Sequence, residues 1–275
     1  MSDLCRTLEV SRSGYYDFKS RPASARDRWR EELAEQIREV YDDSRGLYGS
    51  PRITAELRSS GTLVTEKTVA KLMKQQQIQA KTAGRFRPMT TDSNHDWKAA
   101  DNLLDRDFQA ALPNAKWCCD ITYVPTDEGV LYLAAVIDLC SRRIVGWSMA
   151  PHMKATLCID ALQMALLHRS PSQGLVHHSD RGVQYCCDAY QQQLQQAGLT
   201  PSMSRIGNCY DNAVMESFWG TLKCELIYQQ PNGRFASHQQ ARASIFEYIE
   251  VFYNRRRRHS AIGYLSPEAF EASLN

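Results

Sequence analysis

The chain has 275 residues, of which 43% are hydrophobic and 23% are charged. These fractions exclude disordered, collagen-like and disulfide-scaffold proteins, and the length leaves room for about two domains. With 33 basic and 31 acidic side chains the formal net charge is only +2, so any basic surface must be local.

Targeting signals are absent from the sequence. The first residues lack the apolar run of a secretory signal, and the most apolar stretch, Leu131 to Ile137, is far too short to span a bilayer. Nine cysteines without an export signal indicate a reducing compartment, so we expect a cytoplasmic protein with free thiols and no membrane contact. No spacing of cysteines or histidines typical of a zinc site occurs, so we expect the cysteines to be small buried side chains.

Changes in composition divide the chain into four predicted segments. Residues 1–25 form an N-terminal helical segment, and residues 26–84 form a small all-helical region. A polar linker follows at residues 85–101, without apolar periodicity. Residues 102–275 form an α/β core that ends in a basic C-terminal helix.

The all-helical region is predicted to contain a helix-turn-helix. Leu33, Ile37 and Tyr41 lie on one helical face, and Ser50 and Pro51 are typical of an N-cap and a first helical position. A further helix begins at Thr65, and its outer face carries three lysines, which we expect to contact DNA: Lys67, Lys71 and Lys74. The alternative is a three-helix bundle whose basic face is merely solvated.

Residues from 102 onward alternate between strand and helix patterns. Three β-branched and aromatic runs with short connections predict an antiparallel meander over 117–124, 130–137 and 144–149. Helices over 155–168, 187–197 and 212–227 then alternate with strands over 174–178 and 201–204. This order predicts a mixed sheet with helices on both faces, followed by an amphipathic helix over 237–254.

Three carboxylates are conspicuous because of their positions. Asp120 interrupts an apolar strand, where an unpaired charge costs several kcal/mol. Asp180 follows a short strand, at the kind of edge where α/β sheets bind ligands, and Gly182 permits a turn with positive φ. Glu216 lies on a helix and shares one stripe with Asn212, Gly220 and Lys223.

Together these carboxylates suit a hard divalent cation. Asp120, Asp180 and Glu216 are expected to converge and hold two Mg²⁺ ions, for which Mn²⁺ can substitute. Taken singly, each has a simpler explanation: a salt-bridged core acid, a helix N-cap and a solvated helix residue.

Long motifs resemble those of the DDE transposases of IS3-type insertion sequences, relatives of retroviral integrases. The matching motifs are W-x-x-D-I-T-Y-V, H-S-D-R-G-x-Q-Y and D-N-A-x-x-E-S-F-W-x-x-L-K, and 35 residues separate Asp180 from Glu216. The resemblance implies a ribonuclease-H-like core with a mixed five-stranded sheet, in which Asp120, Asp180 and Glu216 are the catalytic metal ligands. It also implies a second reading frame that is fused to an upstream product by frameshifting.

The expected activity is DNA transposition. A magnesium-activated water would cut a phosphodiester at the end of an insertion sequence, and the freed 3′-OH would attack a second one. The implied partners are double-stranded DNA, as terminal inverted repeats and as target, and further copies of the chain on that DNA. The alternatives are a plain nuclease of the same fold and a DNA-binding regulator without catalysis.

Other polar residues near these motifs have competing interpretations. Asn212 and Lys223 share the Glu216 face and are expected to touch DNA. The basic run is expected to contact phosphates, although it could be a solvated charge block: Arg255, Arg256, Arg257 and Arg258. Asp138 is interpreted as a turn or salt-bridge residue, and His177 and His178 as packed or hydrogen-bonded to the backbone.

Overall fold

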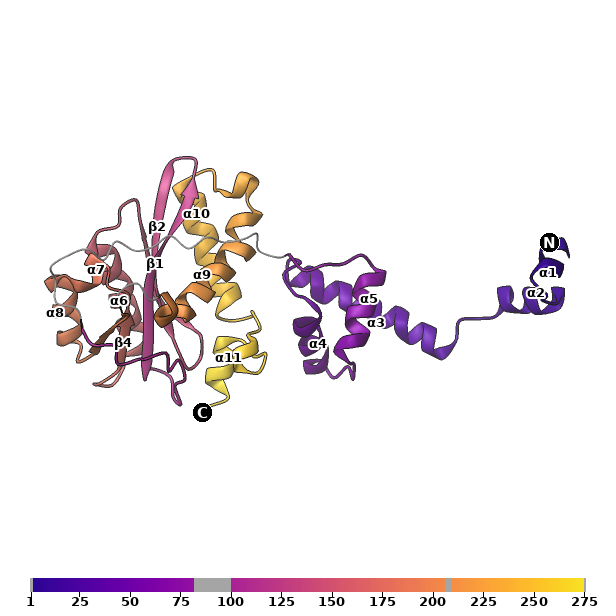
Figure 1. Cartoon of the computed structure of the whole chain (residues 1–275), viewed down its shortest axis with the longest axis horizontal. Coiled ribbons are helices and arrows are strands. Elements are labelled where there is room, and N and C mark those ends of the chain that lie inside the picture. The colour runs from indigo at the N-terminus through magenta and orange to yellow at the C-terminus, as the bar shows by residue number, and fades with distance from the viewer. Residues whose placement is uncertain (1, 82–99, 206–208, 275) are drawn as a thin grey trace. The chain divides into compact units, whose positions relative to one another are not determined.

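The structure, a computed structural model, describes residues 2–81, 100–205 and 209–274. It divides into two compact units, Met1–Ala80 and Lys81–Asn275, which are coloured from indigo to yellow along the chain in Figure 1. Most of the predicted linker, 85–101, lies outside the described residues. The eight cysteines whose side chains are described are free thiols, and six of them are buried.

The first unit is entirely helical. Its helices are α1 (Ser2–Thr7), α2 (Arg12–Ser20), α3 (Ala25–Asp43), α4 (Ser50–Ser59) and α5 (Glu66–Gln75). The apolar face predicted for α3 is buried at Leu33 and Ile37, and α3 packs on α4 and α5, whose side chains Ile53 and Val69 are also buried. One detail of the prediction is wrong, because Gly49 and not Ser50 is the N-cap of α4, with no side-chain cap.

Helices α4 and α5 are joined by residues 60–65, and α5 presents a basic face. The N-cap of α5 is Thr65, whose hydroxyl accepts a hydrogen bond from the Thr68 N–H. Arg58 Nε donates to the Val64 carbonyl at 2.9 Å and so holds the connection against α4. Lys67, Lys71 and Lys74 are all exposed. The geometry therefore leaves them available for the DNA contacts predicted from the sequence.

The second unit contains a mixed five-stranded sheet. Its strands are β1 (Lys116–Thr126), β2 (Gly129–Asp138), β3 (Ile144–Ala150), β4 (Val176–Ser179) and β5 (Thr200–Met203), in the order β3-β2-β1-β4-β5. The three long strands pair antiparallel, whereas β1–β4 and β4–β5 are parallel. This arrangement confirms the predicted ribonuclease-H-like fold.

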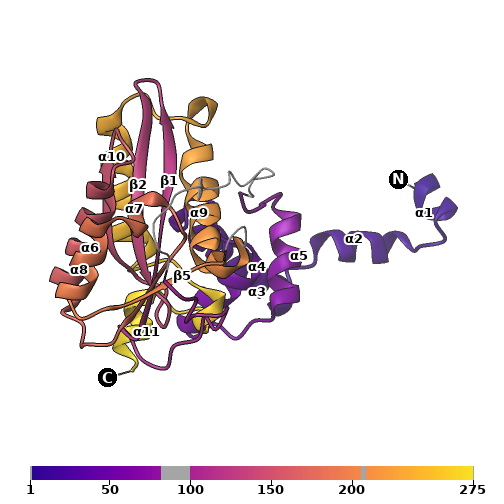
Figure 2. The same cartoon turned by 60° about the vertical axis from the view of Figure 1, so that its left-hand side comes forward.

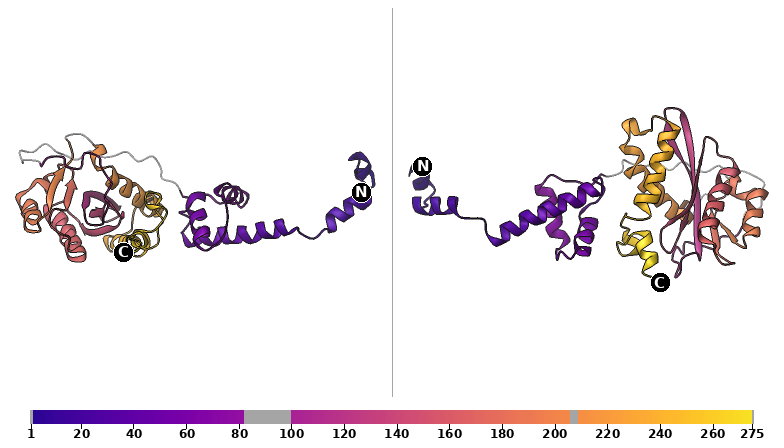
Figure 3. Two further views of the ribbon diagram at one scale, coloured as in Figure 1. Left: turned by 90° about the horizontal axis from the view of Figure 1, so that it is seen from below. Right: turned by 180° about the vertical axis from the view of Figure 1, so that it is seen from behind.

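Helices cover both faces of this sheet (Figures 1 and 2). On one side lie α6 (Ala155–Arg169), α7 (Val183–Cys186) and α8 (Asp188–Gln196), and on the other lie α9 (Ala213–Glu225) and α10 (His238–Phe246). The view from behind in Figure 3 shows the same layers. Alternation along β1 explains the division, because Trp117 and Cys119 join the core beneath α6 and α8, whereas Asp120 faces α9.

Helix α6 packs very closely on β3. A Cβ atom added to Gly146 would lie 2.2 Å from the carbonyl oxygen of Ala161 and 2.6 Å from the amide nitrogen of Ala165. Only the absence of a side chain at this position allows the backbones of the strand and the helix to approach so closely.

The C-terminal segment packs along α9. The predicted helix over 237–254 is α10 followed by a π-helical segment, η4 (Glu247–Tyr253), and a short helix, α11 (Pro267–Ala272), ends the unit. Short 3₁₀ turns complete the chain at Cys209–Asn212 (η1), Ile227–Gln229 (η2), Pro231–Gly233 (η3) and Ser260–Ile262 (η5). Within the described residues, no helix has both the length and the apolar character needed to cross a membrane.

Candidate active site

Asp120 projects from the middle strand of the sheet toward α9. Its Oδ1 accepts a hydrogen bond of 2.8 Å from the Ile121 N–H, and its Oδ2 accepts one of 2.9 Å from Nε1 of Trp219. The side chain is half-buried. Both carboxylate oxygens are therefore held in place by donors of the protein itself.

Asp180 directly follows the neighbouring strand, β4. In the parallel pairing of β1 with β4, Cys118 lies opposite His178, and each acid comes two residues later in its own chain segment. The backbone positions of the two acids therefore lie at corresponding levels, next to the end of β4.

The turn after Asp180 differs from the prediction. Oδ1 of Asp180 accepts the N–H of Gly182 at 2.9 Å, and Gly182 has φ −63°. The predicted positive φ is wrong, because this glycine begins the short helix α7 in an extended conformation that any residue can adopt.

Glu216 lies in the first turn of α9, one turn before Trp219. The indole bond to Asp120 fixes this part of α9 against β1, so the helix that carries the third acid is tied directly to the first acid. Sequence reasoning missed this contact. Trp219 belongs to the quoted helical motif, but no pattern in the sequence indicates where its N–H points.

Asp120 responds electrostatically to the other two acids. Burial raises the pKa of Asp120 to about 8, and the charge of Asp180 and, to a smaller extent, that of Glu216 act in the same direction. Burial also raises the pKa of Glu216. Like charges that share a half-buried region disfavour ionisation, and a bound cation would remove that penalty.

The expected convergence of all three side chains is not present in this structure. Within residues 2–81, 100–205 and 209–274, no three His, Cys, Asp or Glu side chains lie close enough together to hold a metal ion. The donor set nevertheless suits a hard cation, because carboxylate oxygens are the ligands that Mg²⁺ prefers.

Asn212 and Lys223 form the wall of the site. The structure does not support their predicted contacts with DNA, because both side chains are buried. Asn212 is 6% exposed and donates to the Cys119 carbonyl, while its Oδ1 is buried without a partner among the described residues. Lys223 is also 6% exposed, with its ammonium group 5.0 Å from the centre of the Tyr123 ring. Burial lowers the pKa of Lys223, and the negative charge of Asp120 opposes this shift.

The basic run at residues 255–258 is divided between surface and interior. Arg257 is 4% exposed and forms two hydrogen bonds of 2.7 Å with Glu225, so the predicted phosphate contact is wrong for this residue. Arg255 and Arg256 are exposed, and Arg258 is half-buried with a bond to the Tyr264 carbonyl. Because all four residues of this run are arginine, the sequence pattern does not show which of them points into the interior.

Three other predictions concern the buried polar residues Asp138, His177 and His178. Asp138 is buried and accepts the N–H groups of Cys140 and Ser141, as expected of a turn residue. His177 and His178 are packed in the interior as predicted, and their ring nitrogens lie within hydrogen-bond distance of the hydroxyl groups of Tyr190 for His177 and of Ser202 and Ser204 for His178. Burial lowers the pKa of His177 to about 3 and that of His178 to about 4.

Family models match both units of the chain. An integrase core domain matches residues 110–209, a second integrase core domain matches residues 197–267, and an HTH-like domain matches residues 28–86. A ribonuclease-H-like sheet with acids at the strand edge and an integrase core signature define a polynucleotidyl transferase of the transposase and integrase class.

Curated relatives identify the family within that class. Transposase InsF for insertion sequence IS3A of Escherichia coli (strain K12) is 47% identical over 270 residues, which cover 98% of this chain and 92% of the relative. The insertion element IS600 uncharacterized 31 kDa protein of Shigella sonnei is 45% identical over 267 residues, 97% of each chain. The chain belongs to the IS3 family of transposases.

Solved structures with similar folds are distant in sequence. The simian T-cell lymphotropic virus intasome in complex with PP2A regulatory subunit B56 gamma gives a TM-score of 0.49 at 13% identity, covering 86% of this chain and 74% of that chain. The HTLV-2 integrase catalytic core domain in complex with magnesium gives 0.43 at 14% identity, covering 58% and 98%.

Proposed function

We propose that the chain cuts phosphodiester bonds at the ends of an insertion sequence and joins the freed 3′-OH to target DNA, with Mg²⁺ held by Asp120, Asp180 and Glu216. The observation that supports the proposal is the parallel pairing of β1 with β4, in which Asp120 and Asp180 each come two residues after the paired Cys118 and His178. We further propose a site for two ions, in which Mn²⁺ can replace Mg²⁺. When bound, such ions stabilise the developing charge on the phosphoryl oxygens and orient the attacking and leaving oxygens.

Both reactions are displacements at phosphorus. In the first, a water molecule loses a proton as its oxygen bonds to phosphorus, the bond from phosphorus to the 3′ oxygen breaks, and that oxygen takes up a proton to become the new 3′-OH. In the second, this hydroxyl loses its proton and bonds to a target phosphorus, and the 3′ oxygen of the target strand leaves. One phosphodiester replaces another, so the second step consumes no water.

The chain's own residues prepare the site for these steps. The Trp219 N–H fixes one oxygen of Asp120 and the Ile121 N–H fixes the other, so this carboxylate keeps its orientation between the two reactions. The buried ammonium group of Lys223 supplies a positive charge to the wall beside Asp120. The unpartnered Oδ1 of Asn212 offers a further acceptor at this wall.

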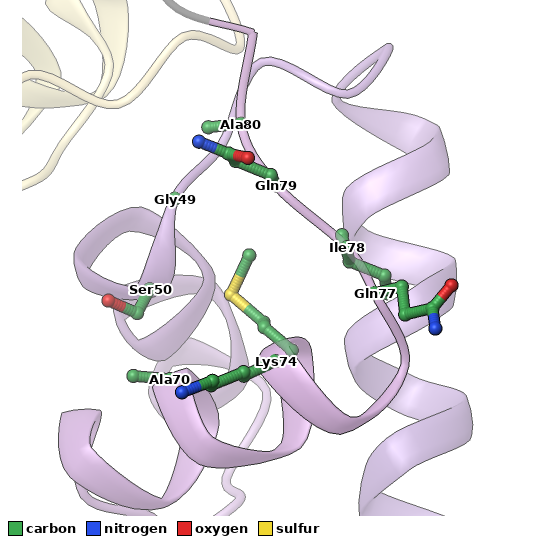
Figure 4. Close-up of a pocket in the computed structure, with 9 residues that line it drawn as sticks. Gly49, Ser50, Ala70, Lys74, Gln77, Ile78, Gln79 and Ala80 are labelled. Atoms are coloured by element: carbon green, nitrogen blue, oxygen red, sulfur yellow. The ribbon is translucent and has the colours of Figure 1, made fainter.

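The helical unit is proposed to bind the terminal inverted repeats. Its basic face presents Lys67, Lys71 and Lys74, as a recognition helix presents cations to DNA. Beside it lies a shallow groove between the start of α4 and the end of α5, lined by Gly49, Ser50, Ala70, Met73, Lys74 and residues 77–80. Figure 4 shows Lys74 extending beside Ala70 with Gly49 and Ser50 above it, where a phosphate would meet both a cation and the N-terminus of α4.

In the catalytic unit, the exposed Arg255 and Arg256, with Arg258 beside them, are proposed to contact phosphates of the same DNA. We further infer that several copies of the chain assemble on the two ends, and that the active form in the bacterial cytoplasm is a fusion with the product of an upstream reading frame.

Cleavage and joining assays test the proposal. Labelled duplexes that carry the two ends of the genomic segment around this reading frame are incubated with the full chain in Mg²⁺. We expect a nick at the element end, and we expect a pre-cut 3′-OH end to become joined to unlabelled target DNA. Asp120→Asn and Glu216→Gln are expected to abolish both products and to leave gel shifts in EDTA unchanged.

Three outcomes oppose the proposal. Nicking without joining would indicate a plain nuclease, and binding without any nick would indicate a regulator. If either acid variant cut at the wild-type rate, the assignment of these acids as catalytic would be wrong.

A further inference from the structure

A second polar cluster lies beside the three acids, around the buried carboxylate of Asp211. Nε of Arg106 donates to it at 3.2 Å, and Arg205 donates through Nε at 3.0 Å and through one terminal nitrogen at 2.9 Å. Asn102 Nδ2 adds a bond of 3.0 Å. The side chain of Asp211 is 0% exposed, whereas those of the two arginines are 50% and 47% exposed. One interior anion therefore holds two guanidinium groups at the surface.

The outer end of Arg106 is positioned over an exposed aromatic ring. Its guanidinium carbon lies 5.7 Å from the centre of the Tyr210 ring, and Tyr210 is 66% exposed. Within the described residues, the terminal nitrogens of Arg106 have no hydrogen-bond partner. An oriented guanidinium with spare donors beside an open ring face is an arrangement that binds a phosphate and stacks a base.

The chain adopts an unfavourable backbone conformation to place Arg106 here. Asp105 and Arg106 both have positive φ, at 39° and 63°. The segment is held by bonds from the Asp105 N–H to Asn102 and from the Leu103 N–H to the Ser202 hydroxyl. Two consecutive non-glycine residues in this region persist only where their surroundings fix them, and such positions cluster at functional sites.

The cluster is linked to the catalytic residues on two sides. Asp211 directly precedes Asn212, which donates to the Cys119 carbonyl next to Asp120. Arg181, which follows Asp180, donates through Nε to the Ser204 carbonyl at 2.6 Å, one residue before Arg205. The cluster therefore borders the edge of the sheet where Asp120 and Asp180 project.

We propose that Arg106 and Tyr210 form a binding site for a nucleotide of the DNA strand next to the bond that is cut, with its base stacked on the Tyr210 ring and its phosphate bound by Arg106. Asp211 and Arg205 are positioning residues of this site, because Asp211 holds the guanidinium of Arg106 and Arg205 holds Asp211, which follows Tyr210 in η1. The inference rests on the proposed function, which supplies the DNA.

A cross-linking experiment tests the stacking contact directly. Duplexes of the element end are prepared with 5-iododeoxyuridine at single positions on either side of the cut, and they are bound to the full chain in Ca²⁺ and irradiated. We expect one position next to the cut to cross-link to Tyr210, as identified by mass spectrometry of the digested protein. Cross-links confined to other residues would overturn the proposal.

Matched variants test the energetic contribution. Tyr210→Ala and Arg106→Gln are expected to weaken binding of the pre-cut end by about tenfold, and Tyr210→Phe is expected to bind like the wild type, because stacking needs only the ring. Tyr228→Ala and Arg234→Gln remove an exposed ring and an exposed guanidinium elsewhere on the same unit, and they are expected to bind normally. Equal affinities for the Tyr210→Ala and Tyr228→Ala variants would contradict the proposal.

The wild-type protein separates the two ways of failing. If it cuts the element end and the Arg106 and Tyr210 variants cut and bind equally well, the nucleotide site is wrong and the proposed function stands. If the wild type neither binds nor cuts these duplexes, the proposed function itself fails. Circular dichroism of each variant confirms that the compared proteins are folded.

Discussion

Nε1 of Trp219 donates a 2.9 Å hydrogen bond to Oδ2 of Asp120 and thereby joins the helix of the third acid to the strand of the first. Donors that hold a metal-binding carboxylate typically contribute 10- to 100-fold to metal affinity or activity. The bond also spans two elements that lie far apart in the sequence. It therefore couples the orientation of one proposed ligand to the position of another.

Removal of this bond is expected to weaken the response to the metal. Trp219→Phe should raise the Mg²⁺ concentration for half-maximal cleavage by about 10- to 100-fold, because Asp120 loses a donor that orients it. The same variant should show a smaller increase in melting temperature on addition of Ca²⁺, a measurement that needs no catalysis.

Trp147→Phe is the matched control. It removes an indole bond of 2.7 Å to Glu250, another carboxylate of the same unit, away from the three acids. If both variants shifted the Mg²⁺ requirement equally, Trp219 would have only a general structural role.

The buried ion pair between Arg257 and Glu225 is expected to govern stability and not DNA affinity. Their side chains are 5% and 7% exposed, so Glu225→Gln leaves an uncompensated buried cation and should lower the free energy of unfolding by about 3–5 kcal/mol. Urea unfolding of the full chain measures this change. Arg255→Gln removes a side chain that is 62% exposed and should change stability by less than about 0.5 kcal/mol. Similar losses in the free energy of unfolding for Glu225→Gln and Arg255→Gln would contradict this prediction.

Two glycines of the catalytic unit should respond oppositely to alanine. Gly146→Ala places a methyl group against the backbone of α6 and should destabilise the protein by about 3 kcal/mol or more. Gly220→Ala meets nothing within 4 Å inside α9 and should stabilise it by about 0.5–1 kcal/mol. Thermal unfolding of both variants checks the signs, and a tolerated Gly146→Ala would show that α6 does not pack so closely on β3.

His177 is expected to make the protein sensitive to acid. Burial lowers the pKa of His177 to about 3 in the folded chain, whereas an unfolded chain has the ordinary value of about 6.5. As the pH falls below about 6.5, the unfolded state binds a proton that the folded state does not bind. The free energy of unfolding therefore falls by up to about 1.4 kcal/mol per pH unit. Urea midpoints measured from pH 7 to pH 4.5 should show this decline, with a shallower slope for His177→Gln. An unchanged slope in this variant would show that His177 does not cause the loss of stability in acid.

The sequence alone predicted most of the architecture. Each predicted strand of the catalytic unit agrees with β1 to β5 to within a few residues, because apolar runs bounded by turns carry a strong local signal. The short helices α7 and α11 were missed, since four or six residues show no full period. The π-helical segment after α10 was likewise not predicted, because its apolar pattern is that of an ordinary α-helix.

The polar contacts of the site were harder to predict. The burial of Lys223 and Arg257 depends on tertiary partners, Tyr123 and Glu225, that no local pattern identifies. The same limit applies to Arg106, which reaches Asp211 across more than a hundred residues. Motif positions indicated which acids matter, but the direction in which each side chain points depends on packing between distant segments.

The central claim is that Asp120, Asp180 and Glu216 share one metal centre, and iron-directed cleavage of the polypeptide tests it most directly. Fe²⁺ replaces Mg²⁺ in the full chain bound to element-end DNA, and ascorbate with peroxide then generates radicals that cut the backbone close to the ion. The account predicts cuts near all three acids, suppressed by excess Mg²⁺ and lost together in Asp120→Asn. Cuts that spare the Glu216 region, or that persist in this variant, would contradict the shared centre.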